Sequence, residues 1–200
     1  MSKDPEIIAA STGRPAAFAE LYERHAVAVY RYAARRTDSG VADDIMSETF
    51  LVAFERRGNY DASFDSALPW LLGIATTLIH KRSRLEARAW RGMLASHQAA
   101  SVSIDQVERL EVRVDAEASV RRITAVLMRM RSGDRDVLLL YAWEDLTYEQ
   151  IAVALDIPVG TVRSRLNRTR RSLRAALDRA GARDEEVEHG RVDNRAQLAQ

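Results

Sequence analysis

The sequence predicts an all-α protein: two small helical domains joined by a flexible linker, with a helix-turn-helix in the C-terminal domain. Three observations lead to this prediction. Apolar residues recur at spacings of three and four, and no long alternating run indicates a strand. Only four prolines and nine glycines interrupt the 200 residues. The apolar pattern fades from about residue 92 to residue 118, where small, polar and acidic residues prevail.

The predicted boundaries follow this pattern. Residues 1–13 form an N-terminal tail, residues 14–91 the first domain, residues 92–118 the linker and residues 119–180 the second domain. Residues 181–200 have no apolar face, so we expect them to be disordered.

Composition excludes several classes of protein. Without cysteine, disulfides and thiolate metal sites are excluded, and a reducing compartment is expected. No segment approaches the roughly 18 apolar residues of a membrane span, so we expect a cytoplasmic protein. The four histidines are scattered, and there is no Ser-His-Asp arrangement, P-loop or dinucleotide fingerprint. We therefore expect no catalytic residue, no metal site and no cofactor.

Three helices are expected in the first domain. Residues 18–36 place six residues at core-like spacing: Phe18, Leu21, Tyr22, His25, Val29 and Tyr32. Residues 41–57, VADDIMSETFLVAFERR, form the second helix. A loop at 57–67 follows, and Pro69 suits the first turn of a third helix over 69–91.

The second helix carries an acidic stripe. Asp44, Glu48 and Glu55 share one narrow face, with Leu51 beside it. This stripe is either the solvated edge of a core helix or a docking ridge for a basic partner surface.

The third helix has the opposite charge. Thr77, Lys81 and Arg84 share one face of this helix. That face either contacts nucleic acid or is simply exposed to solvent. The loop before this helix contains Tyr60 and Phe64. Two interpretations of these rings are equally good: stacking on unpaired bases, or packing of the loop onto the core.

The C-terminal helices form a helix-turn-helix pattern. Thr147 and Gln150 make a capping box for a helix ending at 155, and a second helix begins near Val159. Its predicted core stripe consists of Val162, Leu166, Thr169, Leu173, Ala176 and Leu177.

The opposite face of this last helix is basic. No acidic residue occurs from 157 to 177, whereas a solvated helix would mix charges, so DNA binding is favoured. Arginine pairs with guanine edges and asparagine with adenine edges, so the candidates for reading bases are Arg163, Ser164, Asn167 and Arg168. The remaining arginines are expected either to hold phosphates or to make no specific contact: Arg165, Arg170, Arg171 and Arg174.

Together these stretches resemble a known family. VADDIMSETFLVAF resembles the acidic helix of bacterial RNA polymerase sigma factors, ALPWLLGIATTLIHKRSR their promoter-melting helix, and LTYEQIAVALDIPVGTVRSRLNRTRRSLRAAL their C-terminal helix-turn-helix. The order, spacing and short length are similar to the extracytoplasmic-function (ECF) type, over about residues 14–179.

The resemblance implies a transcription initiation factor with two kinds of partner. Core RNA polymerase would bind through its β′ clamp helices and β flap, the clamp contacting Asp44, Glu48 and Leu51. Promoter DNA would be melted and held at the −10 element by the loop and third helix, through Asn59, Tyr60, Asp61, Phe64, Thr77, Lys81 and Arg84. The −35 element would contact the last helix through Thr161, Arg163, Ser164, Arg165, Asn167, Arg168 and Arg171. An anti-sigma protein is a further partner that the family allows.

Two positions depart from the family pattern, since Thr77 stands where asparagine is common and Ser47 where glutamine is usual.

The rival interpretation is a stand-alone helix-turn-helix regulator whose N-terminal domain senses a ligand or dimerises. Such a domain needs neither an acidic stripe nor a basic melting helix, so the sigma-factor interpretation is preferred.

Overall fold

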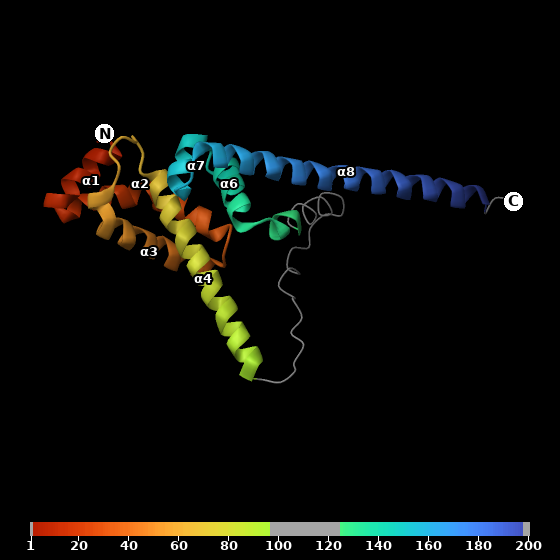
Figure 1. Ribbon diagram of the computed structural model, residues 1–200, viewed down its shortest axis with the longest axis horizontal. Coiled ribbons are helices and arrows are strands. Elements are labelled where there is room, and N and C mark those ends of the chain that lie inside the picture. Colours follow the sequence, from red (N-terminus) through yellow and green to blue (C-terminus); the bar gives the residue numbers. More distant parts are fainter. Residues whose placement is uncertain (1, 97–124, 198–200) are drawn as a thin grey trace. The chain divides into compact units, whose positions relative to one another are not determined.

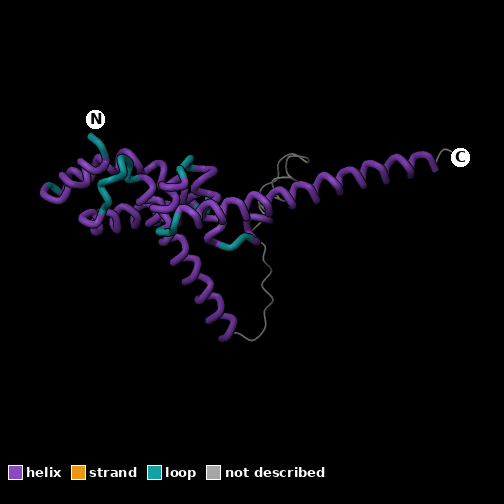
Figure 2. Tube along the Cα trace, turned by 45° about the horizontal axis from the view of Figure 1, so that its top comes forward, coloured by secondary structure: helices purple, strands orange, loops and turns teal. Residues whose placement is uncertain are grey.

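We describe the protein from a computed structural model, which covers residues 2–96 and 125–197 (Figure 1). Within these residues every regular element is a helix, as predicted (Figure 2). Residues 97–118 of the predicted linker and 119–124 of the predicted second domain lie outside the described residues.

The chain's contacts define two compact units. One comprises Met1–Ser101 and Leu139–Val162, and the other comprises Val102–Leu138 and Arg163–Gln200. The predicted domain boundaries rest on sequence pattern rather than on contacts, and they stay a prediction.

The first unit begins with helix α1, Asp4–Gly13, and a short 3-10 helix, η1, Pro15–Phe18. Ile7 and Ile8 are each only 3% exposed. Residues 4–13 therefore belong to the packed unit, whereas the sequence placed them in a tail. Two adjacent isoleucines in so short a segment make no repeating apolar stripe, which is why periodicity missed the helix.

Helices α2, Ala19–Ala34, and α3, Ser39–Arg56, pack against each other and against α4, Leu68–Ser96. The 3-10 helix η2, Arg57–Asn59, and a loop connect α3 to α4. The core contains the predicted Leu21, Val29 and Tyr32, all fully buried. Tyr22, predicted to be buried, is instead 42% exposed. Its ring packs edge-on against that of Phe50, with the ring centroids 4.8 Å apart.

Two further helices are α6, Ser132–Trp143, and α7, Tyr148–Leu155. The predicted capping box of α7 is confirmed: the Gln150 N–H donates to the Thr147 hydroxyl at 3.2 Å, and the Thr147 N–H to the Gln150 side chain at 2.8 Å. Within the first unit α7 packs on α4, where a Cβ on Gly73 would lie 2.1 Å from the carbonyl oxygen of Ala154. Only glycine allows this approach.

Helix α8 runs from Val159 to Gln197. Val162, Leu166 and Thr169 are buried as predicted, but Leu177 is 47% exposed, so the buried stripe is shorter than expected. The helix also passes residue 181, where the sequence suggested disorder. Arginine and glutamate supply six of residues 181–197, and both residue types favour a helix without needing a packing face.

Candidate nucleic-acid interface

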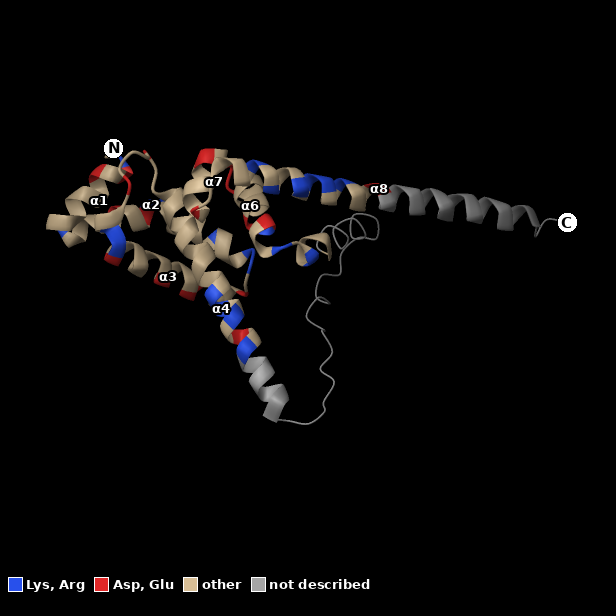
Figure 3. Ribbon diagram, in the orientation of Figure 1, with Lys and Arg blue, Asp and Glu red and all other residues tan. Residues whose placement is uncertain are grey.

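The exposed face of α8 is basic along its first half (Figure 3). Arg163, Ser164 and Asn167 are exposed there, whereas Val162 and Leu166 on the other face are at most 1% exposed. The buried residues orient the helix, so that the predicted base-reading side chains remain accessible.

Two of the predicted contact arginines have partners inside the protein. One Arg168 nitrogen, Nη1, donates to both carboxylate oxygens of Asp134 at 2.9 and 2.8 Å, and the Asp134 side chain is only 8% exposed. Arg165 donates to the carbonyl of Gly133 at 3.2 Å. Both arginines thus tie α8 to the first turn of α6. Sequence periodicity could not reveal this, because the Asp134 partner lies 34 residues upstream.

A groove lies beside α8 within the second unit. Its lining includes Arg129, Arg168, Arg171 and Ser172. Three cationic side chains and a hydroxyl suit an anion such as a phosphate group.

The predicted acidic stripe on α3 is exposed. The side chains of Asp44 and Glu48 are 67% and 46% exposed, and Leu51 is 59% exposed. Behind the stripe, Ala42, Ile45 and other α3 residues are buried. The helix therefore presents two carboxylates and a large apolar side chain to solvent.

The predicted basic face of α4 lies next to this stripe. Arg82 pairs with Asp44 at 3.1 Å, and Lys81 with Glu48 at 3.6 Å. These pairs are exposed, so each contributes only about 0–1 kcal/mol and exchanges partners readily. Thr77 and Arg84 are also exposed, and the Thr77 hydroxyl donates to the Gly73 carbonyl at 3.0 Å.

The loop before α4 is folded on itself. The Tyr60 ring packs against Trp70, with centroids 5.1 Å apart, and its hydroxyl donates to the Phe64 carbonyl at 2.9 Å. Burial raises the pKa of Tyr60 to about 12, with Asp4, Asp61 and Asp65 acting in the same direction, so the hydroxyl keeps its proton. Tyr60 and Phe64 are half-buried, whereas Asn59 and Asp61 are exposed.

Asp61 organises the tip of this loop. Its carboxylate accepts from the Ser63 N–H at 3.0 Å, and this bond lowers the pKa of Asp61. The predicted loop residues thus share one short, internally bonded segment.

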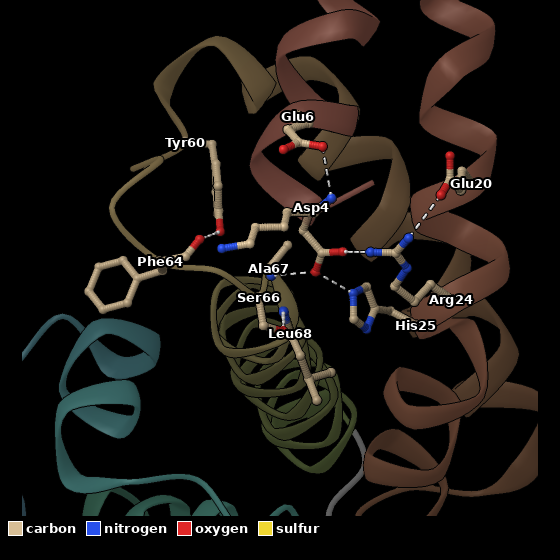
Figure 4. Close-up of polar contacts among 11 residues, drawn as sticks. Asp4, Glu6, Glu20, Arg24, His25, Tyr60, Phe64, Ser66, Ala67 and Leu68 are labelled. Carbon is tan, nitrogen blue, oxygen red and sulfur yellow. Dashed lines mark hydrogen bonds and ion pairs between the residues drawn. The ribbon is translucent and has the colours of Figure 1, made fainter. Parts of the chain in front are cut away.

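Sequence reasoning missed a buried charged network at the base of the loop. Asp4 of α1 is 2% exposed and contacts Arg24, His25 and the Ala67 backbone (Figure 4). A single aspartate close to the chain start carries no motif. The prediction that His25 is a structural core residue is confirmed, since it is 8% exposed and bonded to Asp4.

The described part of the chain offers neither a metal-binding cluster nor a membrane-spanning helix. No cluster of three or more His, Cys, Asp or Glu residues there could hold a metal ion. No helix among those residues is long and apolar enough to cross a membrane.

Comparisons with known proteins agree with the predicted motifs. The profile of sigma-70 region 2 matches residues 21–89, and that of sigma-70 region 4 matches residues 121–173. The ECF RNA polymerase sigma factor SigK of Mycobacterium tuberculosis is 31% identical over 166 residues, which is 82% of this chain and 87% of SigK. SigC of the same species is 32% identical over 158 residues, or 74% of this chain and 76% of SigC.

Solved structures show the same fold. CnrH, in complex with the cytosolic domain of CnrY, aligns with a TM-score of 0.60 at 24% identity, covering 88% of this chain and 97% of that one. The sigma factor RpoE from Bartonella quintana, in complex with the anti-sigma factor NepR, aligns with a TM-score of 0.58 at 18% identity, covering 80% of this chain and 96% of that one. With two sigma-70 regions in order and relatives this similar over most of its length, the chain belongs to the ECF sigma factors of RNA polymerase.

Proposed function

We propose that this sigma factor binds core RNA polymerase, recognises −35 and −10 promoter elements and separates the strands at the start of transcription. The single observation that carries the proposal is the pairing, on adjacent helices α3 and α4, of an exposed acidic stripe with an exposed basic face. A regulator that only binds duplex DNA needs neither surface, so the stand-alone regulator is not favoured.

Polymerase docking is assigned to Asp44 and Glu48 of the acidic stripe and to the neighbouring Leu51. Two carboxylates attract a basic helical surface, and Leu51 supplies the apolar contact that a charged interface requires at its centre. The weak ion pairs to Lys81 and Arg82 would exchange for polymerase partners at little cost.

Recognition of the −10 element is assigned to the loop and the neighbouring face of α4. Asn59, Tyr60, Asp61 and Phe64 would surround an unstacked base, and Thr77, Lys81 and Arg84 would follow the backbone of the single strand. In this role the folded loop offers a shaped surface rather than free aromatic rings, which is supported by the packing of Tyr60 on Trp70.

Recognition of the −35 element is assigned to α8. Arg163, Ser164 and Asn167 are the preferred base-reading residues because they are exposed and lie in its first turns. Thr161, Arg165, Arg168 and Arg171 are assigned to phosphate contacts and to supporting the helix, since Arg165 and Arg168 already bond to α6.

This work is binding and strand separation, without covalent chemistry, cofactor or metal. Favourable contacts to unstacked bases would offset the cost of melting, which is a few kcal/mol per base step. The location would be the cytoplasm, where polymerase and chromosome meet. An anti-sigma protein is a further proposed partner, as CnrH and RpoE were solved bound to CnrY and NepR.

Run-off transcription with purified core polymerase tests the proposal. The chain should direct specific transcripts from promoters with a suitable pair of elements, beginning with the promoter of its own gene. Duplex binding without any polymerase-dependent transcript would favour the stand-alone regulator instead.

A further inference from the structure

The buried carboxylate of Asp4 collects three hydrogen bonds from separate parts of the first unit (Figure 4). Its Oδ2 accepts from the Ala67 N–H at 2.7 Å and from His25 Nε2 at 2.6 Å, and its Oδ1 accepts from Arg24 Nη1. Asp4 belongs to α1, Arg24 and His25 to α2, and Ala67 to the end of the loop. One side chain therefore joins three elements.

Ala67 stands where the loop becomes helix α4. Its carbonyl accepts the first helical bond, from the Leu71 N–H at 3.0 Å, while its own N–H has no partner within the helix. Asp4 supplies that partner, and the neighbouring Leu68 N–H donates to the Ser66 hydroxyl at 3.2 Å. Since Ala67 is fully buried, water does not replace Asp4 there.

The loop therefore has one fixed end and one internal closure. Asp4 holds Ala67 at the base, and the Tyr60 hydroxyl closes the loop on Phe64. Lys3, the N-cap residue of α1, makes a second contact to the same loop, as it pairs with Asp65 at 3.0 Å on the surface. Helix α1 thus flanks the segment to which −10 recognition is assigned, although the region 2 profile begins only at residue 21.

We propose that Asp4 is a positioning residue for −10 recognition, holding the Ala67 N–H so that the loop keeps one orientation against α4. Asp4 itself touches no DNA. Its loss would leave the loop attached but mobile at its base, and a pocket for an unstacked base requires placement to within about half an ångström. This inference rests on the proposed function of the loop.

A carboxylate suits this position better than its amide. Three donors converge on Asp4, one of them a guanidinium that carries a positive charge. Asparagine would have a similar size but would turn an N–H group toward one of these donors. Asp4→Asn is therefore a small change in volume that specifically disturbs the network.

The test compares Asp4→Asn with Glu6→Gln in the full chain, each assembled with core polymerase. Glu6 lies on the same helix, and its carboxylate accepts from the exposed Lys3 N–H rather than from the loop or α2, so it is a matched control. Three quantities are measured: affinity for core polymerase, −35 duplex binding, and open-complex formation reported by 2-aminopurine in the −10 element. Open complexes are measured on promoters with intact and with substituted −10 sequences.

We expect Asp4→Asn to slow open-complex formation about tenfold or more and to reduce discrimination between the two −10 sequences. Polymerase affinity and −35 binding should match those of Glu6→Gln. A template already unpaired at −10 should restore the opening rate but not the discrimination. Equal losses in every quantity, or behaviour like that of the control, would overturn the proposal.

If Asp4→Asn does not fold, the proposal is tested by swapping the charges of the surface ion pair between Lys3 and Asp65. Lys3→Asp breaks the exposed pair with Asp65 and should weaken −10 discrimination about twofold, while Lys3→Asp combined with Asp65→Lys should restore it. Unchanged discrimination in the single variant would then overturn the role of α1.

If the unaltered chain directs no promoter-specific transcription, the proposed function fails and this inference fails with it. If it transcribes normally and Asp4→Asn matches the control, only the inference fails.

Discussion

Two aspartates show how this chain stabilises buried charge. Asp4 is buried against Arg24 and His25, and Asp134 is buried against Arg168. For Asp4, burial disfavours the charged form, but the bonds from the Ala67 N–H, His25 and Arg24 outweigh it, so the pKa of Asp4 lies below 3.8. In both cases the charged partner lies at least 20 residues away in the sequence. The spacing of apolar residues along one helix does not reveal such a contact.

The lowered pKa of Asp4 makes part of the stability depend on pH. The charged carboxylate stabilises the fold above the unfolded value of 3.8, and this contribution disappears as pH falls through the lowered folded value. Asp4→Asn should therefore cost about 1–3 kcal/mol at pH 7 and progressively less below about pH 4. Urea unfolding at several pH values measures this, with Asp43→Asn, an exposed site, as control. A cost that does not change with pH would contradict the assignment.

Arg163 and Arg168 should differ in what they contribute. Arg168→Ala leaves the buried Asp134 carboxylate without its arginine and should lower the free energy of unfolding by about 1–3 kcal/mol. Arg163→Ala, at an exposed position, should leave stability unchanged but cost about 1–3 kcal/mol of discrimination at a particular −35 base.

Thermal or urea unfolding and duplex binding to a panel of −35 sequences separate the two effects. The double variant Arg168→Ala with Asp134→Asn should recover much of the lost stability, because no buried charge is then left alone. Equal stability losses for Arg163→Ala and Arg168→Ala would argue against this division of roles.

Among the elements, those with strong periodicity were predictable and those without it were not. The stripe of Leu21, Val29 and Tyr32 predicted α2, and the Thr147–Gln150 box predicted the start of α7. Helix α1 was missed because Ile7 and Ile8 show no repeat. The exposed residues of the candidate surfaces were found from charge patterns, but the supporting residues Asp4 and Asp134 follow only from the tertiary structure.

The exposed acidic stripe on helix α3 leads to a prediction about polymerase binding. Asp44→Lys combined with Glu48→Lys should reduce affinity for core polymerase at least about tenfold, because like charges would then face the basic clamp surface. Asp43→Lys is the matched control, since Asp43 is exposed on the same helix but outside the stripe. Affinity is measured by fluorescence anisotropy of labelled full-length chain. Undiminished affinity in the double variant would eliminate the docking assignment.

The whole molecule has a formal net charge of only +1, yet its charges are strongly segregated. The acidic stripe lies on α3, and basic residues gather on α4 and α8 (Figure 3). A net charge near zero therefore conceals one acidic surface and two basic ones. Their signs suit a basic protein and an anionic polymer, and only the distribution of charge along the chain reveals them.

This segregation predicts a salt dependence. Binding of the full chain to a −35 duplex should weaken steeply as salt rises, because phosphate contacts release counterions. Arg171→Ala should reduce the slope of log K against log salt by about one, without changing the preference among −35 sequences. Titrations over a range of salt concentrations measure the slope. A changed preference at constant slope would instead assign Arg171 to base reading.

The position of Asp4 has a practical consequence for laboratory work on this protein. A chain shortened to begin at residue 14 or 21 would keep every residue matched by the region 2 profile, yet it would lack the helix that holds the Ala67 N–H. On the proposed role of Asp4, purification tags belong at the C-terminal end, and activity measured with a chain that lacks residues 4–13 would underestimate that of the full sequence.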